Sequence, residues 1–283
     1  MPVKIFRFLS LFPLAFLHAF GAALGYAVYL SSPTYRERLR GNIESAGFAS
    51  SLPAAIRASG KSILELAFVW CAPPSRVLNS ARIENWEIVQ SALDEKRGVI
   101  FLTPHLGCFE IIAQSIAART KVTVMYRPPR KEALKPLIEG ARARENLLLA
   151  PANLAGVRIM ARALKKGEAI GLLPDQVPEQ GEGMWADFFG RPAYTMTLPA
   201  KLHLMSGAPL ILSYAERLPH GAGFAVRFVR FEETLGDTSE QQAHAINRAM
   251  EKLISQCPSQ YFWSYNRYKT PSGAPAMPLE KQG

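Results

Sequence analysis

The chain has 283 residues, 48% of them hydrophobic, and a formal net charge of +10. This length and composition exclude disorder as the main state, and they suffice for one large α/β domain with at most a short appendage. The positive charge indicates an anionic partner, which is nucleic acid, an acidic membrane surface or a phosphorylated substrate. The three cysteines lie far apart without a Cys-x-x-Cys pair, which argues against a disulfide framework and a zinc site.

Residues 8–30 form an apolar segment without Lys, Arg, Asp or Glu. About 20 apolar residues cross the core of a bilayer, so we expect residues 1–33 to be a hydrophobic membrane anchor and residues 34–283 to be the α/β domain. Basic residues flank the segment on both sides and leave its orientation open. Pro13 is expected to kink or begin the helix, so the segment either spans the bilayer or dips into one leaflet. A cleaved signal peptide and a buried core helix are the alternatives.

The rest of the chain alternates between predicted strands and predicted helices. A helical section covers residues 34–77 and ends at Pro73-Pro74. Apolar and β-branched runs predict strands at residues 98–102, 122–126, 147–149, 169–173, 209–214 and 224–231. Helical spacing predicts helices at 109–119, 131–145, 154–166, 195–206 and 239–256, with a long loop at 177–194. This order predicts an α/β fold with a mostly parallel sheet flanked by helices.

A histidine and a glutamate stand beside the first of these strands. His105 follows strand 98–102, and Glu110 lies five residues later in the next helix. Ligands of open α/β sheets bind at the carboxyl ends of the strands. Five residues turn about 500° on an α-helix, so the two side chains meet only if His105 lies in the turn before the helix. We expect Glu110 to accept a hydrogen bond from one imidazole nitrogen, which leaves the other nitrogen to take a proton.

The sequence holds no familiar motif for a nucleophilic side chain. Neither a Gly-x-Ser-x-Gly elbow nor a His-Glu-x-x-His zinc motif occurs in it. A substrate hydroxyl is therefore the expected nucleophile, and it needs a base in contact as it attacks. Backbone N–H groups at the start of the helix after His105 are expected to stabilise the oxyanion of a tetrahedral intermediate. A hydrogen-bonded turn histidine beside a solvated glutamate is the alternative.

The His-x-x-x-x-Glu pattern after an apolar strand resembles the first motif of the glycerolipid acyltransferase superfamily. More closely, the chain resembles the bacterial lipid A late acyltransferases, the lauroyl and myristoyl transferases of lipopolysaccharide assembly, over nearly its whole length. Beside the hydrophobic N-terminus, the similar blocks are residues 103–110 (TPHLGCFE), 126–128 (YRP), 173–176 (LPDQ), 188–190 (FFG), 193–195 (AYT), 260–263 (QYFW) and 267–269 (RYK). The chain has Asn266-Arg267 where many members have His-Arg.

This resemblance implies an enzyme that moves a fatty acyl chain from acyl carrier protein to a hydroxyl of a lipid A precursor. It implies the bacterial inner membrane as the location, with the catalytic domain on the cytoplasmic face. We expect no metal, no cofactor and no nucleic acid partner. Two catalytic residues and four substrate-binding residues are implied, namely His105 and Glu110 in the first role and Arg127, Arg144, Asp175 and Gln176 in the second. The resemblance also implies that Asp175 lies near His105, where it would orient the acceptor or assist the base, and a turn or N-cap aspartate is the alternative.

Three other functions stay open. A related acyltransferase would act on another glycolipid or on a lysophospholipid. A secreted hydrolase would require a mature form that lacks the residues before about Tyr26. A basic module that binds a membrane or nucleic acid without catalysis would explain the charge, and it would bind DNA in a salt-dependent manner.

Overall fold

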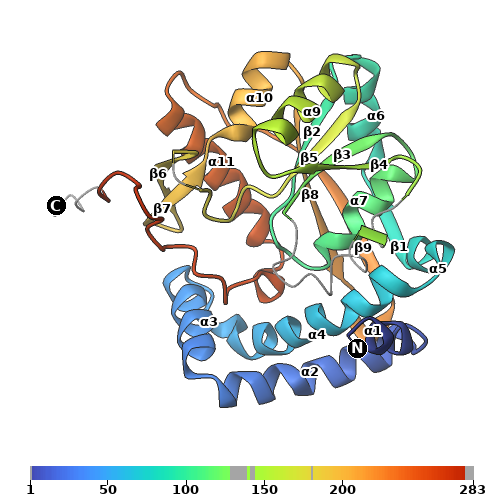
Figure 1. Cartoon of the computed structure of the whole chain (residues 1–283). Coiled ribbons are helices and arrows are strands. Elements are labelled where there is room, and N and C mark those ends of the chain that lie inside the picture. Colours follow the sequence, from blue (N-terminus) through green and yellow to red (C-terminus); the bar gives the residue numbers. More distant parts are fainter. Residues whose placement is uncertain (1, 128–138, 141–143, 180, 278–283) are drawn as a thin grey trace.

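The computed structural model describes residues 2–127, 139–140, 144–179 and 181–277. It shows an α/β body with a layer of N-terminal helices beneath it (Figure 1). The strands are β1 (Ala81–Glu84), β2 (Val99–Leu102), β3 (Val122–Tyr126), β4 (Leu147–Pro151), β5 (Ala169–Leu172), β6 (Gly183–Phe188), β7 (Arg191–Met196), β8 (Leu210–Arg217) and β9 (Phe224–Arg230). The helices are α1 (Pro2–Leu9), α2 (Leu14–Ser31), α3 (Pro33–Ser45), α4 (Leu52–Cys71), α5 (Pro74–Asn79), α6 (Trp86–Asp94), α7 (Phe109–Ala117), α9 (Leu154–Lys165), α10 (Leu198–Ser206) and α11 (Ser239–Ile254).

A seven-stranded sheet in the order β1-β9-β8-β2-β5-β3-β4 forms the centre of the body. Neighbouring strands in it are parallel, except that β8 and β9 are antiparallel. Strands β6 and β7 form a separate antiparallel hairpin. The mostly parallel sheet with flanking helices that the sequence predicted is therefore confirmed.

Helices cover both faces of this sheet because its central strands carry apolar side chains on both sides. In β2, Ile100 and Leu102 belong to the core that α9, α10 and α11 close. Val99 and Phe101 belong to the opposite core, which α5, α6 and α7 close. All four side chains are buried, so β2 is fixed from both faces and its carboxyl end is a rigid platform.

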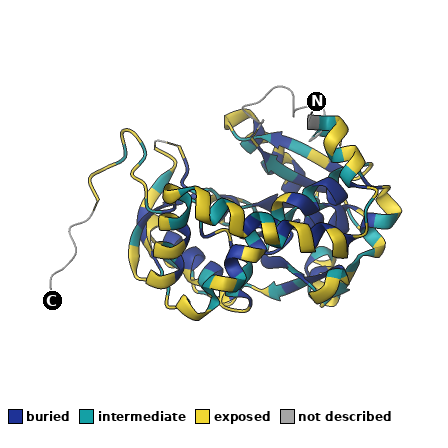
Figure 2. Ribbon diagram, turned by 90° about the horizontal axis from the view of Figure 1, so that it is seen from below, coloured by how far each residue is buried: buried dark blue, intermediate teal, exposed yellow. Residues whose placement is uncertain are grey.

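The apolar N-terminal segment folds as two helices. Helix α1 ends at Leu9, and Pro13 directly precedes α2, as the missing N–H of a proline favours. Helix α2 is the one helix, within the part of the chain that the structure describes, long and apolar enough to cross a membrane. Its backbone packs closely against α4, and 28% of its residues are buried. Figure 2 shows this layer from below, with exposed residues along its outer side.

Most of the elements predicted from the sequence are present. The six predicted strands are β2, β3, β4, β5, β8 and β9, with small shifts at their ends. The predicted helices 154–166 and 239–256 correspond to α9 and α11, and Asn153 caps the first of them by accepting from the backbone of Gly156. The predicted helix 131–145 falls largely outside the described residues.

Two predictions in the region 177–206 were wrong. The predicted loop 177–194 contains β6 and most of β7, because Trp185, Phe188 and Tyr194 turn inward and are buried. The predicted helix 195–206 begins only at Leu198, since residues 195 and 196 still belong to β7. The structure also adds β1 and α6, which the sequence did not indicate. Helix α5 begins at Pro74, within the proline pair at which we expected the helical section to end.

Candidate active site

The candidate base and its carboxylate partner follow two neighbouring parallel strands. Leu102 of β2 is in register with Leu172 of β5, and both strands end there. His105 and Asp175 each come three residues later. Because the two strands are hydrogen-bonded to each other, their following loops emerge side by side at the carboxyl edge of the sheet. Strand pairing therefore brings together two residues that are 70 positions apart in the chain.

Asp175 holds His105 with both of its carboxylate oxygens. Its Oδ1 lies 2.8 Å from Nδ1 of the imidazole, and its Oδ2 accepts from the backbone N–H of His105 at 2.8 Å. Asp175 is 1% exposed. Burial alone would raise its pKa, but the charge of His105 and the two hydrogen bonds lower the pKa below the ordinary value. An ionised Asp175 accepts a hydrogen bond from Nδ1–H of His105, so the lone pair of the imidazole is on Nε2.

This geometry corrects the pairing that we expected for Glu110. Asp175, not Glu110, accepts the orienting hydrogen bond from Nδ1, and the amide of Gln176 lies 3.1 Å from Nε2. Glu110, at the start of α7, accepts a hydrogen bond from Nε1 of Trp70 at 3.0 Å. Both His105 and Glu110 line the same cavity. Direct participation of Glu110 in catalysis therefore stays a prediction.

Backbone hydrogen bonds attach the loop before α7 to β8 and to the segment at Gln260. Gly107 donates to the carbonyl of Gln260 at 3.0 Å, and Cys108 donates to the carbonyl of Ala215 at 2.8 Å. A side chain at Gly107 would place its Cβ 1.8 Å from the Ala215 oxygen, and its φ is +61°. Only glycine tolerates both conditions, so this position fixes the approach of the His105 loop to β8.

These bonds also change the expected oxyanion site. The N–H groups of residues 105–108 all donate to protein acceptors: Asp175, the Pro104 carbonyl, the Gln260 carbonyl and the Ala215 carbonyl, in chain order. They are not available to a substrate oxygen without breaking those bonds. The backbone N–H groups of this segment that could still donate to an oxyanion are thus those of the first residues of α7. The side-chain amide of Gln176, next to Nε2, is a further donor at the same place.

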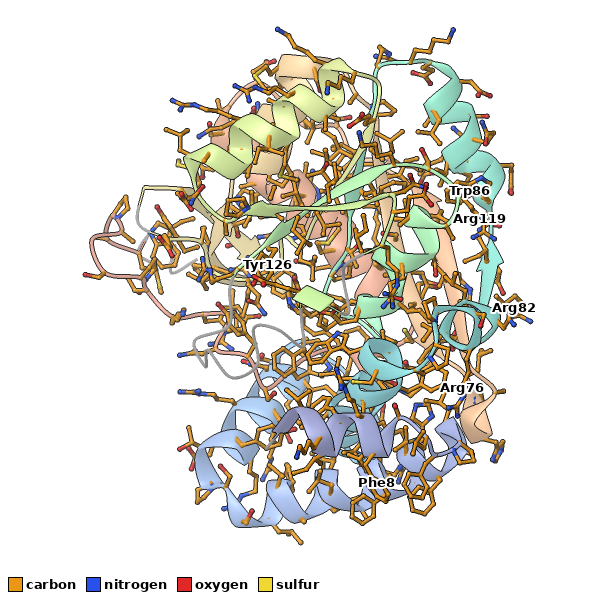
Figure 3. All side chains as sticks on the ribbon, turned by 45° about the vertical axis from the view of Figure 1, so that its right-hand side comes forward. Phe8, Arg76, Arg82, Trp86, Arg119 and Tyr126 are labelled. Atoms are coloured by element: carbon orange, nitrogen blue, oxygen red, sulfur yellow. The ribbon has the colours of Figure 1, made fainter. Side chains whose placement is uncertain are left out.

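A cavity of about 640 Å³ opens above His105. Its walls are formed by the beginning of α7, the ends of β3 and β5, and the beginnings of α9 and α10. Apolar side chains make up much of the lining, including Phe109, Ala113, Val124, Val157 and Leu172. Tyr126, labelled in Figure 3, lies at the carboxyl end of β3 on this cavity. A cavity of this composition suits an alkyl chain beside a few polar groups.

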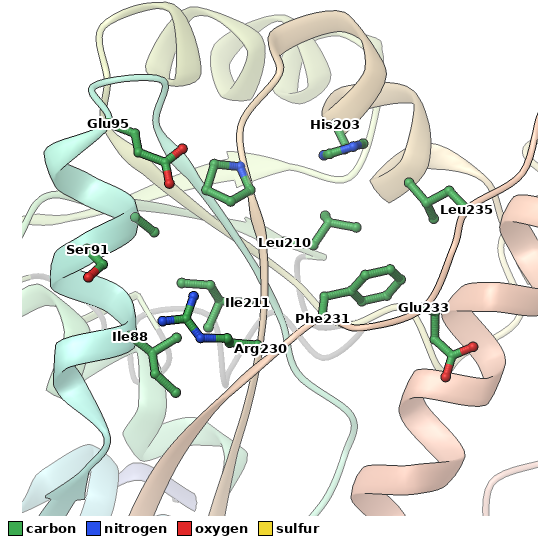
Figure 4. A pocket seen from close by; sticks show the side chains of 12 residues that line it. Ile88, Ser91, Glu95, His203, Leu210, Ile211, Arg230, Phe231, Glu233 and Leu235 are labelled. Carbon is green, nitrogen blue, oxygen red and sulfur yellow. The ribbon is translucent and has the colours of Figure 1, made fainter.

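A second cavity of about 400 Å³ lies at the opposite edge of the sheet (Figure 4). It is lined by the beginning of β8, the end of β9 and nearby residues such as Glu95 and His203. This is the amino edge of the parallel strands, where open α/β sheets rarely carry their active sites. None of the six residues predicted for the site lines it.

The two predicted arginines lie in different places. Arg127 directly follows β3, lines the large cavity, and pairs with Glu179 at 3.3 Å where both side chains are largely exposed. Arg144 precedes β4 and bridges to Leu147 through its backbone. Arg144 is thus at the amino edge of β4, and burial lowers its pKa. Substrate binding by either residue stays a prediction.

The cysteine nearest to His105 is not a nucleophile. Cys108 is buried, and burial together with the nearby Glu65 raises the pKa of its thiol well above the ordinary value. A thiol in this setting carries almost no thiolate at neutral pH. Among the described residues that line the cavity with His105 there is no Ser or Cys, which agrees with attack by a substrate hydroxyl.

The structure adds three residues that the sequence did not single out. Trp70 reaches Glu110 from α4, and Lys201 and Lys269 line the large cavity from α10 and the C-terminal segment. No local pattern marks Trp70 or Lys201, because both arrive from distant parts of the chain. Lys269 belongs to a block that resembled the family's C-terminal signature, which was the one available signal.

A mostly parallel sheet that presents a carboxylate-held histidine to a cavity with many apolar side chains is the geometry of an enzyme that can activate a hydroxyl by general-base catalysis. The particular family follows from comparison with known proteins: residues 3–270 match the family model of the bacterial lipid A biosynthesis acyltransferases. The chain belongs to this family and is an acyltransferase. Membership also rules against the binding module without catalysis.

Three relatives illustrate the similarity. The lipid A biosynthesis lauroyltransferase of Escherichia coli is 28% identical over 221 residues, which are 77% of this chain and 71% of the relative. The lipid A biosynthesis palmitoleoyltransferase of Escherichia coli is 29% identical over 217 residues, or 76% and 70% of the two chains. A lipid A biosynthesis acyltransferase of Haemophilus influenzae is 27% identical over 189 residues, or 65% and 58%.

Proposed function

We propose that this enzyme transfers a fatty acyl chain from the thioester of acyl carrier protein to a hydroxyl of a lipid A precursor. The observation that carries the proposal is the orientation of His105, whose Nδ1 is held by the buried Asp175 while Nε2 lies beside the amide of Gln176, a second residue that lines the cavity. The names of the relatives support the transfer of a fatty acyl chain in lipid A biosynthesis. They give different acyl chains, so chain length has to be measured.

The reaction follows from this geometry. Nε2 of His105 takes the proton of the acceptor hydroxyl as its oxygen attacks the thioester carbonyl carbon. The resulting imidazolium is stabilised by the Asp175 carboxylate. The tetrahedral intermediate then expels the thiolate, which takes the proton from His105, and an ester and a free thiol are the products. No acyl-enzyme forms.

Gln176 has two positions in this scheme. In the structure its amide nitrogen lies 3.1 Å from Nε2 of His105. The acceptor hydroxyl needs the same lone pair, so substrate binding displaces the amide from Nε2. The displaced amide is then close to the carbonyl that becomes the oxyanion, and one such donor is worth about 10²–10³ in turnover. Gln176 thereby acts as a substrate-binding residue, as the resemblance implied.

Cations around the cavity support anionic substrates. Arg127, Lys201 and Lys269 line it, and fork-shaped or ammonium groups suit the phosphates of a lipid A precursor or of the phosphopantetheine arm. Helix α9 extends from the cavity wall and exposes a row of basic residues, Arg158, Arg162, Lys165 and Lys166. An acidic carrier protein would dock on this row.

Exposed apolar side chains support attachment to a membrane. Helices α1 and α2 and the turn between them leave large apolar residues exposed: Ile5, Phe8, Leu11, Phe16, Phe20 and Leu30. Such a set is unusual on a protein surface in water and favours contact with lipid. Because α2 also packs along α4, we propose that it inserts beside the body instead of standing free in the bilayer. We place the site at the cytoplasmic face of the bacterial inner membrane.

One assay tests the proposal directly. Purified full-length protein in detergent is incubated with acyl carrier proteins that carry saturated chains of several lengths, and with a radiolabelled lipid A precursor. We expect one acyl chain to be added to the precursor and free carrier protein to be released. Transfer from the thioester to lysophospholipids but not to the precursor would overturn the acceptor, and transfer from coenzyme A thioesters alone would overturn the donor.

A further inference from the structure

Two separate sets of contacts connect the N-terminal helices to the active site, one to Glu110 at the start of α7 and one to the loop that carries His105. We infer that α1 and α2 position His105 and Glu110 and are therefore part of the catalytic scaffold as well as a membrane attachment. The inference rests on the roles proposed above for these two residues. It assigns positioning functions to Trp70, Glu65 and Arg217, which do not touch the substrate.

The first connection runs from α1 to Glu110. Phe6 stacks on Trp70, with ring centroids 5.8 Å apart and planes inclined by 17°. The indole Nε1 of Trp70 donates to Oε2 of Glu110 at 3.0 Å. The stack fixes the plane of the indole, and the indole fixes the direction of one carboxylate oxygen. A displacement of α1 therefore displaces a hydrogen-bond donor of Glu110.

The second connection runs from α2 to the His105 loop. Nε2 of His18 lies 3.0 Å from Oε2 of Glu65, and the Glu65 carboxylate accepts from Nε and Nη2 of Arg217 at 2.6 and 2.5 Å. The backbone of Arg217 exchanges two hydrogen bonds with the Gln260 amide, at 2.8 and 3.1 Å. The main-chain carbonyl of Gln260 accepts from the backbone N–H of Gly107 at 3.0 Å, and Gly107 lies two residues after His105.

Burial makes this second connection stiff. His18, Glu65 and Arg217 are all buried side chains. A buried charge that loses its partner is strongly destabilised, because water cannot replace the lost contact. The three groups therefore keep their relative positions as long as α2 stays in place. A helix that served only as a tether would not need a buried contact with Glu65, the carboxylate that holds Arg217 at the end of β8.

Close packing fixes α2 against α4 along the same stretch. A Cβ on Gly25 would lie 2.1 Å from the carbonyl oxygen of Ile56, and a Cβ on Gly60 would lie 2.0 Å from the carbonyl oxygen of Gly21. Backbones that approach this closely leave no room for a side chain. At the other end, Arg76 donates to the carbonyls of Ser10 and Phe12 at 2.7 and 2.9 Å, which ties down the turn between α1 and α2. Figure 3 labels Arg76, which lies on α5, and Phe8, which lies on α1 just before this turn.

The test separates positioning from membrane attachment by working in detergent, where no bilayer is present. Gly25→Leu in the full-length protein pushes α2 away from α4 while it keeps the segment apolar. Gly41→Leu is the matched control, because the space around Gly41 in α3 is open. Misplacement of catalytic groups by about 1 Å costs up to about 10²-fold, so we expect kcat for acyl transfer to fall at least tenfold in Gly25→Leu, with KM for the thioester within threefold. Full kcat in Gly25→Leu would overturn the inference.

A second variant keeps the test decisive if Gly25→Leu does not fold. Trp70→Phe keeps an aromatic ring beside Phe6 and removes the indole N–H that donates to Glu110. Trp86→Phe is its control, since Trp86 lies on α6 and packs on Phe228. We expect kcat to fall about tenfold in Trp70→Phe, with little change in KM or in Tm, and no change in Trp86→Phe.

Unchanged kcat in Trp70→Phe would overturn the inference on its own. His105→Ala distinguishes the two levels of the proposal. An active His105→Ala enzyme contradicts the proposed function, whereas an inactive one together with normal Gly25→Leu and Trp70→Phe enzymes contradicts only the positioning by α1 and α2.

Discussion

Replacing Asp175 by Asn changes one atom of the site and tests how His105 is held. The Asp175 carboxylate accepts two hydrogen bonds from His105, one from Nδ1 and one from the backbone N–H. The amide of Asn has one oxygen, so it satisfies only one of them. If the oxygen faces the backbone, the amide N–H₂ donates to Nδ1 and the imidazole proton moves to Nε2. The base then has no lone pair for the acceptor hydroxyl.

The expected loss follows from that wrong tautomer. The corresponding change in serine proteases lowers kcat by about 10⁴, and a general base contributes about 10²–10⁴. We therefore expect Asp175→Asn to lower kcat by about 10³–10⁴, which is about 4–5.5 kcal/mol of transition-state stabilisation. The free energy of unfolding should fall by about 1–3 kcal/mol, because one buried polar group loses its partner.

Acyl transfer in detergent, measured under single-turnover conditions, gives the rate of the chemical step. Urea unfolding of the same samples shows whether the fold is kept. Asp187→Asn is the control, since this aspartate is exposed on β6. A folded Asp175→Asn enzyme with a rate within tenfold of the unchanged protein would refute the proposed orientation of His105.

Three further predictions concern other groups. Gln176→Ala should lower kcat about 10²-fold at similar KM, as expected for one oxyanion donor; an unchanged kcat in the transfer assay would remove Gln176 from the mechanism. Burial would raise the pKa of Glu65, but Arg217 and His18 lower it to about 2 from an ordinary 4.5. Since the pKa of Glu65 is lower in the folded protein than in the unfolded one, its ionisation stabilises the fold above about pH 4.5. About 3 kcal/mol of the free energy of unfolding is lost as the pH falls toward 2. Urea unfolding as a function of pH should show this loss, and the free energy of unfolding of Glu65→Gln should depend less on pH in this range. The Cys108 thiol, with its raised pKa, should resist iodoacetamide at pH 8 in the folded protein and react in urea, which peptide mass spectrometry resolves; rapid labelling in the folded state would contradict its buried position.

The sheet was predictable from the sequence because its strands are buried on both faces. Runs such as residues 99–102 are wholly apolar and end at prolines or polar residues, so their position needs no knowledge of the fold. The β6–β7 hairpin was not predictable in the same way. Its inward residues, such as Trp185 and Tyr194, alternate with a mixture of small, charged and proline residues that is also typical of loops.

The site was predictable only as far as local sequence reaches. The motif placed His105 and Glu110 near one strand end, and the structure finds both on one cavity. The orienting partner of His105 is Asp175, because β2 and β5 are neighbours and Leu102 pairs with Leu172. That neighbour relation depends on strand order, which local sequence does not encode, and only the family resemblance implied that Asp175 lies near His105. Trp70 and Gln260 are further examples, since both reach the site from segments far away in the chain.

The most direct test of the whole account is acyl transfer by His105→Ala, compared with the unchanged protein and with His220→Asn, which alters an exposed histidine. Acyl carrier protein thioester and lipid A precursor are the substrates, and intact-mass spectrometry follows the product. We predict that His105→Ala stays folded in detergent and loses transfer by at least about 10²-fold, while His220→Asn keeps its rate. Turnover of the His105→Ala protein near that of the unchanged enzyme would contradict the account.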